Sequence, residues 1–198
     1  RGWQPVKRGD DVASAGEDPG EAPPTSFARA AREWVVLLVA AFGVALLLRT
    51  FLLQPFGIPS ASMVPTLQVG DKVLVNKISY DLHDVNRGDV IVFKAPPGME
   101  RAGVNDLIKR VIGLPGETVE GREGHIYVND RLLAEPYLPG NVQSKVFGPE
   151  KIPPGRYWML GDNRQNSQDS TYFGTVDGAT IVGRAFVRWW PLGRLGLL

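Results

Sequence analysis

The chain contains no cysteine among its 198 residues. A disulfide framework, a thiolate zinc site and a cysteine nucleophile are therefore all excluded. An excess of either charge is also lacking, because 22 basic residues balance 21 acidic residues and the formal net charge is +1. Phosphate binding depends on a concentrated surplus of Lys and Arg, so this composition argues against nucleic acid as a partner.

Histidine, the usual base of a serine hydrolase, occurs only twice. His83 lies in a polar segment, and His125 follows a glycine at the expected start of a strand. We expect both side chains to be ordinary surface groups. A serine nucleophile in this chain would therefore need another base, and lysine can serve if burial lowers its pKa toward neutrality.

The N-terminal segment is rich in Gly, Pro, Ala and acidic residues, and residues 1–26 show almost no periodic apolar positions. Such a composition cannot bury enough surface to become ordered. We therefore predict a flexible tail over residues 1–32. The chain begins with Arg1 rather than methionine, so we also expect the sequence to be a fragment or a trimmed product.

A long apolar run follows the tail. It is uninterrupted from Trp34 to Leu48 and continues to Leu53 with two polar members, Arg49 and Thr50. About 20 such residues are enough for a helix to cross the roughly 30 Å of hydrocarbon in a bilayer. We predict a transmembrane anchor over residues 33–53, although a cleaved signal peptide or a buried core helix would also show a run of this kind. We favour the anchor because cleavage at the small residues downstream would destroy the serine motif described below.

Beyond the apolar run, the chain changes to short β-branched stretches separated by Gly, Pro and Asn, which is an antiparallel β pattern. These stretches lie at 72–77, 89–94, 107–112, 118–120, 125–128 and 179–190. Asn129 and Asp130 tolerate positive φ and predict a tight hairpin turn. We expect no helix of ordinary length here. The predicted fold class is mainly β, with one antiparallel β-sheet domain over residues 54–198.

A serine-rich turn, Pro59-Ser60-Ala61-Ser62-Met63-Val64-Pro65, follows shortly after the apolar run. The two prolines restrict the chain, so the segment could be only a stiff linker between anchor and domain. Rigidity is also what a nucleophile needs, because its geometry must be set before the substrate arrives. Ser62 is the candidate nucleophile.

The candidate base is Lys109, in the apolar run 107–112. Strand alternation places Leu107, Lys109 and Val111 on one face and Ile108, Arg110 and Ile112 on the other. Each face then carries one charge among apolar neighbours, and we expect one of the two charges to be buried. The alternative, that both reach solvent on an edge strand, stays open. A buried amine would need its pKa lowered by about 3 units from about 10.4 to act as a base near pH 7.

A third cluster, residues 161–171, is dense in Asp, Asn and Ser. Such residues hydrogen-bond their own backbone and are typical of a compact structural loop. The alternative is an active role, in which a hydroxyl or carboxylate of the loop orients the lysine amine.

Taken together, these segments resemble type I signal peptidases, the membrane-anchored serine proteases that remove signal peptides from exported preproteins. The similarity extends from about Phe51 to Trp190, and its motifs lie at 55–67, 88–93, 108–117 and 161–170. The resemblance implies that Ser62 is the nucleophile and Lys109 the general base, acting through an acyl-enzyme without a metal or organic cofactor.

The resemblance also assigns supporting roles. The Ser62 backbone N–H and the Ser60 hydroxyl would form the oxyanion hole, Ser167 would hydrogen-bond the lysine amine, and Asp169 would support the site. Arg110 would be structural. The family often has Asp and Arg at the positions of Gln165 and Thr171. The missing arginine puts the ion pairing of Asp169 in question.

The implied partners are signal peptides of preproteins, the lipid bilayer and, as a further candidate, the translocation machinery. An extended substrate would add as a strand beside residues 107–109 and the segment before Ser60, and would be cut after small residues in an Ala-x-Ala pattern. The catalytic domain would be extracytoplasmic and the tail cytoplasmic. The residues predicted to line the substrate pockets are Phe56, Ile58, Pro59, Met63, Leu67, Val92, Leu107 and Ile108. Two alternatives are a self-cleaving repressor with the same dyad and a catalytically idle anchored β-domain that binds export partners.

Overall fold

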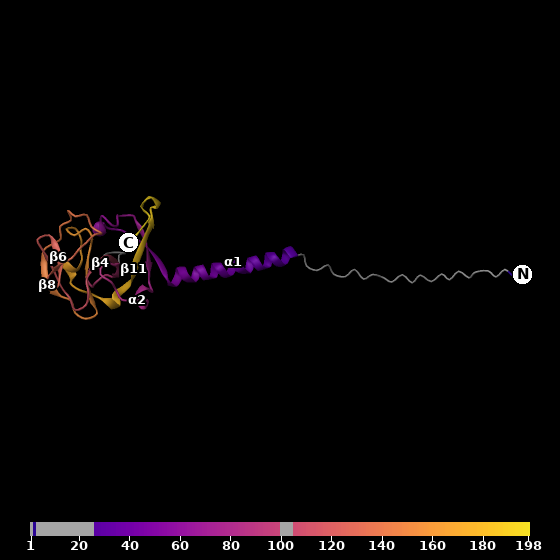
Figure 1. Cartoon of the computed structure of the whole chain (residues 1–198), viewed down its shortest axis with the longest axis horizontal. Helices are drawn as coiled ribbons and strands as arrows, with labels where there is room; N and C mark the ends of the chain where they lie inside the picture. The colour runs from indigo at the N-terminus through magenta and orange to yellow at the C-terminus, as the bar shows by residue number, and fades with distance from the viewer. Residues whose placement is uncertain (1, 3–25, 100–104) are drawn as a thin grey trace. The chain divides into compact units, whose positions relative to one another are not determined.

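A computed structural model describes residues 2, 26–99 and 105–198, and the chain divides after Gly43 into two compact units. Helix α1, Ser26–Phe51, is the long helix in Figure 1. It begins earlier than residue 33 because the preceding residues are mostly Ala and Arg, which favour helix. Most of the predicted tail lies outside the described residues. Within the described part of the chain, no helix is both long and apolar enough to cross a membrane.

The described residues of the second unit form two antiparallel sheets, which confirms the mainly β prediction. The larger sheet has the strand order β1-β2-β11-β3-β4-β9-β10, with β12 paired to β11. Its strands are β1 Leu53–Gly57, β2 Lys72–Asn76, β3 Val90–Lys94, β4 Asp106–Gly113, β9 Arg156–Leu160, β10 Val176–Asp177, β11 Ile181–Trp190 and β12 Gly196–Leu197. Strand β4 therefore lies well inside the sheet, which is where the candidate base stands.

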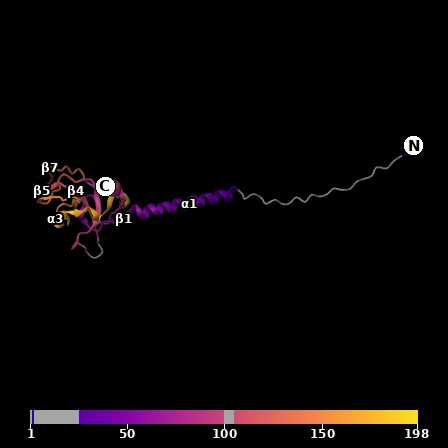
Figure 2. The same ribbon diagram turned by 90° about the horizontal axis from the view of Figure 1, so that it is seen from below.

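The smaller sheet has the order β7-β6-β5-β8, and both views place it at one end of the second unit (Figures 1 and 2). Its strands are β5 Thr118–Arg122, β6 His125–Val128, β7 Arg131–Leu132 and β8 Phe147–Lys151. The predicted turn between β6 and β7 is confirmed, with φ of 49° at Asn129 and 62° at Asp130. Positive φ at both central residues matches the right-handed twist of the paired strands.

The predicted stretches did not include β1, β8, β9, β10 and β12. Of these, β1 and β8 each contain a proline and each lie at the edge of a sheet. Proline lacks the N–H that a central strand must donate, so it is tolerated only where one side of the strand is unpaired. After α1, whose last part belongs to this unit, the described residues form only single helical turns, α2 Ser79–Leu82 and α3 Ser170–Phe173, and three short 3₁₀ segments. The expectation of no ordinary helix here is confirmed for the residues that the structure describes.

Apolar side chains cover both faces of the larger sheet. In β3, Val90 and Val92 join one core cluster while Ile91 and Phe93 join another. The first cluster also contains Met63 of the serine-rich turn and the two residues that flank this turn, Ile58 and Leu67, all of which are at most 4% exposed. Burial of these three anchors the serine turn against the sheet.

Candidate active site

Ser62 stands on the 3₁₀ turn Ala61–Met63, directly before a fully buried methionine. Because Met63 and Leu67 are 0% exposed, the turn cannot shift without opening the core. Ser62 itself is half-exposed, and its hydroxyl oxygen lies 3.4 Å from the Ser60 hydroxyl oxygen. The turn therefore presents two hydroxyl groups to solvent from a rigid base.

Lys109 reaches this turn from β4. Its amine nitrogen lies 2.8 Å from the Ser62 hydroxyl oxygen and donates a second hydrogen bond to the Ile108 carbonyl at 2.9 Å. The residue is only 3% exposed. Two residues 47 positions apart in the chain are thus in direct hydrogen-bond contact. The histidines take no part, since His83 and His125 are both exposed, as expected.

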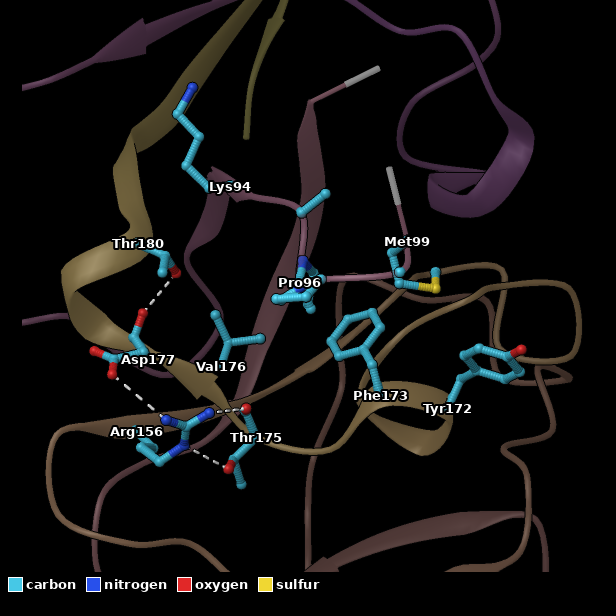
Figure 3. Close-up of a pocket in the computed structure, with 13 residues that line it drawn as sticks. Lys94, Pro96, Met99, Arg156, Tyr172, Phe173, Thr175, Val176, Asp177 and Thr180 are labelled. Carbon is cyan, nitrogen blue, oxygen red and sulfur yellow. Dashed lines mark hydrogen bonds and ion pairs between the residues drawn. The ribbon is translucent and has the colours of Figure 1, made fainter. Parts of the chain in front are cut away.

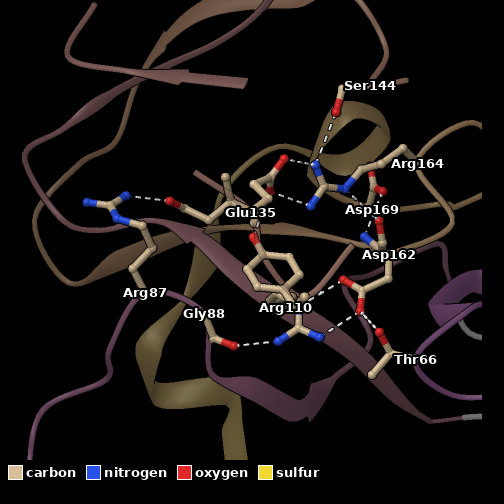
Figure 4. Close-up of polar contacts among 12 residues, drawn as sticks. Thr66, Arg87, Gly88, Arg110, Glu135, Ser144, Asp162, Arg164 and Asp169 are labelled. Atoms are coloured by element: carbon tan, nitrogen blue, oxygen red, sulfur yellow. Dashed lines mark hydrogen bonds and ion pairs between the residues drawn. The ribbon is translucent and has the colours of Figure 1, made fainter. Parts of the chain in front are cut away.

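Both charges of the Lys109-Arg110 pair are buried, whereas we expected one of them to be. Arg110 is 4% exposed and forms a two-point ion pair with Asp162, at 2.9 Å from Nε and 2.7 Å from Nη2 (Figure 4). It also donates to the Gly88 carbonyl and stacks on the Tyr137 ring. A paired guanidinium can be buried as a cation.

Lys109 has no such partner, since no described carboxylate lies within ion-pair distance of its amine. Burial therefore favours the neutral form and lowers the pKa of Lys109 to about 8, while the negative charges of Asp169 and Asp162 act weakly in the opposite direction. About one amine in ten is then neutral at pH 7. This is the state that can accept a proton.

The polar loop after β9 lies against the dyad. Asp169 is 1% exposed and accepts hydrogen bonds from the Gly161 N–H at 3.0 Å and from the Thr171 hydroxyl at 2.7 Å. Asp169 thus receives a hydrogen bond from the neutral hydroxyl of Thr171. Ser167 is buried, and its hydroxyl forms no hydrogen bond with any described residue, so the expected contact with the Lys109 amine is not made in this structure.

Residues that the sequence did not single out hold this loop in place. Arg164 forms an ion pair with Glu135 at 2.6 Å and donates to the Ser144 hydroxyl at 3.1 Å (Figure 4). The Lys145 amine donates to the Ser167 carbonyl at 2.7 Å. These partners come from the segment between β7 and β8. They are far from the loop in the sequence, so no local pattern predicts the contacts.

The loop also forms hydrogen bonds directly with the 3₁₀ turn Ala61–Met63. The Asn163 N–H donates to the Ser62 carbonyl at 3.0 Å, and its side-chain amide donates to the Ala61 carbonyl at 3.1 Å. A side chain at Gly161 would place its Cβ 2.4 Å from the Ser62 carbonyl oxygen and 2.2 Å from the Ser167 hydroxyl. Glycine is required there because loop and turn pack backbone to backbone.

A family model described as signal peptidase, peptidase S26, matches residues 31–190. The chain belongs to this family. It is 42% identical over 180 residues to a probable signal peptidase I-2 of Synechocystis sp., covering 90% of this chain and 80% of the relative. It is 46% identical over 160 residues to a signal peptidase I of Leptolyngbya laminosa, covering 78% and 77%.

Identity to signal peptidase IB of Staphylococcus aureus is 37% over 176 residues, covering 80% of this chain and 89% of the relative. A crystal structure of a signal peptidase I from Enterococcus faecalis V583 matches with 34% identity and a TM-score of 0.44, covering 52% of this chain and 97% of that one. The protein is thus a type I signal peptidase by family, a serine peptidase and a hydrolase.

A cleft of about 620 Å³ opens beside Ser62 and Lys109. Its walls are Pro59, Ser60, Ala61, Ser62, Met99, Leu107, Lys109 and residues 165–168. Four other apolar residues predicted to line pockets belong to the core instead: Ile58, Met63, Leu67 and Val92. Phe56 and Ile108 are half-buried and pack against that core. Strand alternation predicts which residues share one face of β3. It does not predict that the residues around the serine turn pack on this face and bury it.

A second hollow, of about 540 Å³, shares Met99 with the cleft (Figure 3). Its charged groups are already engaged. The Arg156 guanidinium donates hydrogen bonds to the Thr175 hydroxyl and the Asp177 carboxylate. The Lys94 amine forms an ion pair with Asp106 at 2.7 Å. No group of three or more potential metal ligands occurs among the residues described here.

Proposed function

We propose that this peptidase is a membrane-anchored serine endopeptidase that removes N-terminal signal peptides from exported preproteins after Ala-x-Ala. The 2.8 Å contact between the Ser62 hydroxyl and the Lys109 amine carries the proposal. It pairs a nucleophile with a buried base whose pKa is lowered to about 8. Relatives named signal peptidase I support signal peptides as the substrate class.

The reaction proceeds through an acyl-enzyme. Neutral Lys109 takes the hydroxyl proton as the Ser62 oxygen bonds to the scissile carbonyl carbon. The C–N bond then breaks, and the Lys109 ammonium returns the proton to the leaving amine. Water, deprotonated by the same amine, attacks the ester and releases the signal peptide. The Ser62 N–H and the Ser60 hydroxyl stabilise the negative oxygen, and no step needs a metal or organic cofactor.

Sheet pairing supports an extended substrate. Residues 106–109 of β4 pair with β3 on one side, whereas β9 pairs with β4 only from Arg110 onward. This leaves the edge of β4 beside Lys109 unpaired by any described strand. A peptide backbone can add to such an edge by strand addition, which places its scissile bond near Ser62. We expect small side chains beside the cut, as in the Ala-x-Ala pattern.

Membrane anchoring rests on the sequence. The run from Trp34 to Leu53 has only two polar residues, and at about 3.3 Å per residue the nine-residue distance to Ser62 keeps the nucleophile within about 30 Å of the bilayer. We place residues 54–198 outside the cytoplasm and the tail inside. The bilayer and preprotein signal peptides are the proposed partners, and the translocation machinery is a further candidate.

A cleavage assay tests the proposal. The full chain in detergent, incubated with a preprotein containing Ala-x-Ala, should release the mature protein with an N-terminus directly after the second alanine. Ser62→Ala should remove this activity, because no other described hydroxyl contacts the Lys109 amine. Sequencing of the product N-terminus measures the cut. Equal cleavage by the Ser62→Ala variant would reject the dyad, whereas absence of cleavage by the wild type would favour an idle binding domain.

The rate should depend on pH through the lysine. Because only neutral Lys109 can accept the serine proton, kcat/KM should rise about tenfold per pH unit below an inflection near pH 8 and level off above it. Initial rates between pH 5.5 and 9.5 measure the profile, with circular dichroism to show that the fold persists. A rate that is flat from pH 6 to 9, or an inflection near that of a solvated lysine, would contradict the assigned base.

A further inference from the structure

Asn163 holds the peptide groups on both sides of Ser62. Its backbone N–H donates to the Ser62 carbonyl at 3.0 Å, and its side-chain amide donates to the Ala61 carbonyl at 3.1 Å. The loop that carries Asn163 is itself fixed, because the preceding Asp162 is 0% exposed and ion-paired. Asn163 therefore joins a rigid loop to the nucleophile turn at two points.

The side-chain bond has a consequence for the Ser62 N–H. The peptide between Ala61 and Ser62 is trans and planar, so its C=O and N–H point in opposite directions. The Ala61 carbonyl is held by the Asn163 amide and by the Val64 N–H at 3.1 Å. When the direction of the carbonyl is fixed, the direction of the N–H is fixed as well, because both lie in the same plane and point opposite ways.

The Ser62 N–H is available for a ligand. It lies in the first turn of a 3₁₀ segment, where N–H groups have no partner within the helix. No described residue accepts a hydrogen bond from it. It is also the backbone donor that the proposed reaction directs at the negative oxygen.

We infer that Asn163 is a positioning residue whose side-chain amide aims the Ser62 N–H at the oxyanion. The inference rests on the proposed function, and it adds to the dyad a residue that touches neither the substrate nor Lys109. An oxyanion donor acts mainly in the transition state, so its misdirection should lower kcat and leave KM nearly unchanged.

The test compares full-length Asn163→Ala and Asn163→Asp with the wild type in detergent. Both variants lack the amide donor, and the aspartate variant keeps the shape of the side chain. We expect kcat for an Ala-x-Ala peptide to fall about 10- to 100-fold with KM within about twofold. For Asn163→Ala the inflection of the pH profile should stay in place, because the substitution adds no charge and Asn163 does not contact the lysine amine.

Asn86→Ala is the matched control. The Asn86 amide also donates to a backbone carbonyl, that of Asp84 at 3.1 Å, but it lies outside the cleft. Its removal should leave kcat unchanged. If the wild type does not cleave the peptide, the proposed function fails. If the wild type cleaves and both Asn163 variants match it, only the inference about Asn163 fails.

Inhibitor binding separates positioning from a purely structural role. A peptide aldehyde forms a tetrahedral adduct with Ser62 and should bind the Asn163 variants more weakly by about the factor lost in kcat, whereas an uncleavable peptide of the same sequence should bind as in the wild type. Equal weakening of both ligands would overturn the inference. If Asn163→Ala melts below the assay temperature, the same pair of affinities measured on Asn163→Asp below its Tm decides the question.

Discussion

Replacing Lys109 by methionine should abolish peptide hydrolysis while leaving the protein at least as stable as the wild type. The activity is lost because the amine is the only base in contact with the Ser62 hydroxyl among the described residues. We expect kcat/KM to fall about 10³-fold or more. Methionine is similar in length and suits a site that is 3% exposed.

The stability result follows from the direction of the pKa shift. Burial lowers the pKa of Lys109 from 10.5 to about 8, so at pH 7 the folded protein holds a cation that water would solvate better. The corresponding penalty is at most about 3 kcal/mol, and it is fully present below pH 8 and disappears above the unfolded pKa. Loss of two hydrogen bonds offsets about 1 kcal/mol each. The variant should therefore gain about 1 kcal/mol, or a few degrees in Tm.

Lys151→Met is the control for this experiment. Its amine also donates to a backbone carbonyl, that of Gly116, but it is exposed on the smaller sheet. The substitution should leave both kcat/KM and Tm close to wild type. A Lys109→Met variant that retains activity, or one that loses several kcal/mol in urea unfolding, would contradict the description of Lys109 as a buried and unpaired amine.

Removing Asp162 should cause the largest loss of stability in this domain. Asp162→Ala leaves Arg110 as a buried cation without its counter-ion, and it also removes the acceptor of the Thr66 hydroxyl at 2.5 Å. Breaking a buried ion pair on one side costs about 3–5 kcal/mol, which is a large part of the stability of a typical domain. The ion pair joins β4 to the polar loop after β9, and the Thr66 hydrogen bond joins that loop to the segment after the serine turn, so activity should fall with stability.

A surface ion pair provides the comparison. Glu120 lies 2.7 Å from Arg122 on the smaller sheet, and both side chains are partly exposed. Glu120→Ala should cost far less than Asp162→Ala because solvent screens the pair. Urea unfolding of both variants in the same detergent measures the difference. Equal losses for the two substitutions would show that the Arg110 and Asp162 pair is not desolvated.

Several features of the fold were predictable because they depend on neighbours in the chain. The hairpin at Asn129 and Asp130 follows from two residues that tolerate positive φ. The central strands follow from β-branched runs that are buried on both faces. By contrast, β1 and β8 carry prolines and show no strand pattern, and their pairing is imposed by the neighbouring strand at each sheet edge.

The sequence by itself determined the mainly β class and the two segments that hold Ser62 and Lys109, because motif spacing and strand periodicity are local properties. Only the tertiary structure decided that Lys109 and Arg110 are both buried. The difference between them depends on Asp162, more than 50 positions away along the chain, which neutralises the guanidinium and not the amine. It also decided the position of Asn163 against the serine turn. Burial and charge pairing are set by residues distant in sequence, and these determine which of two adjacent cations has its pKa lowered toward neutrality.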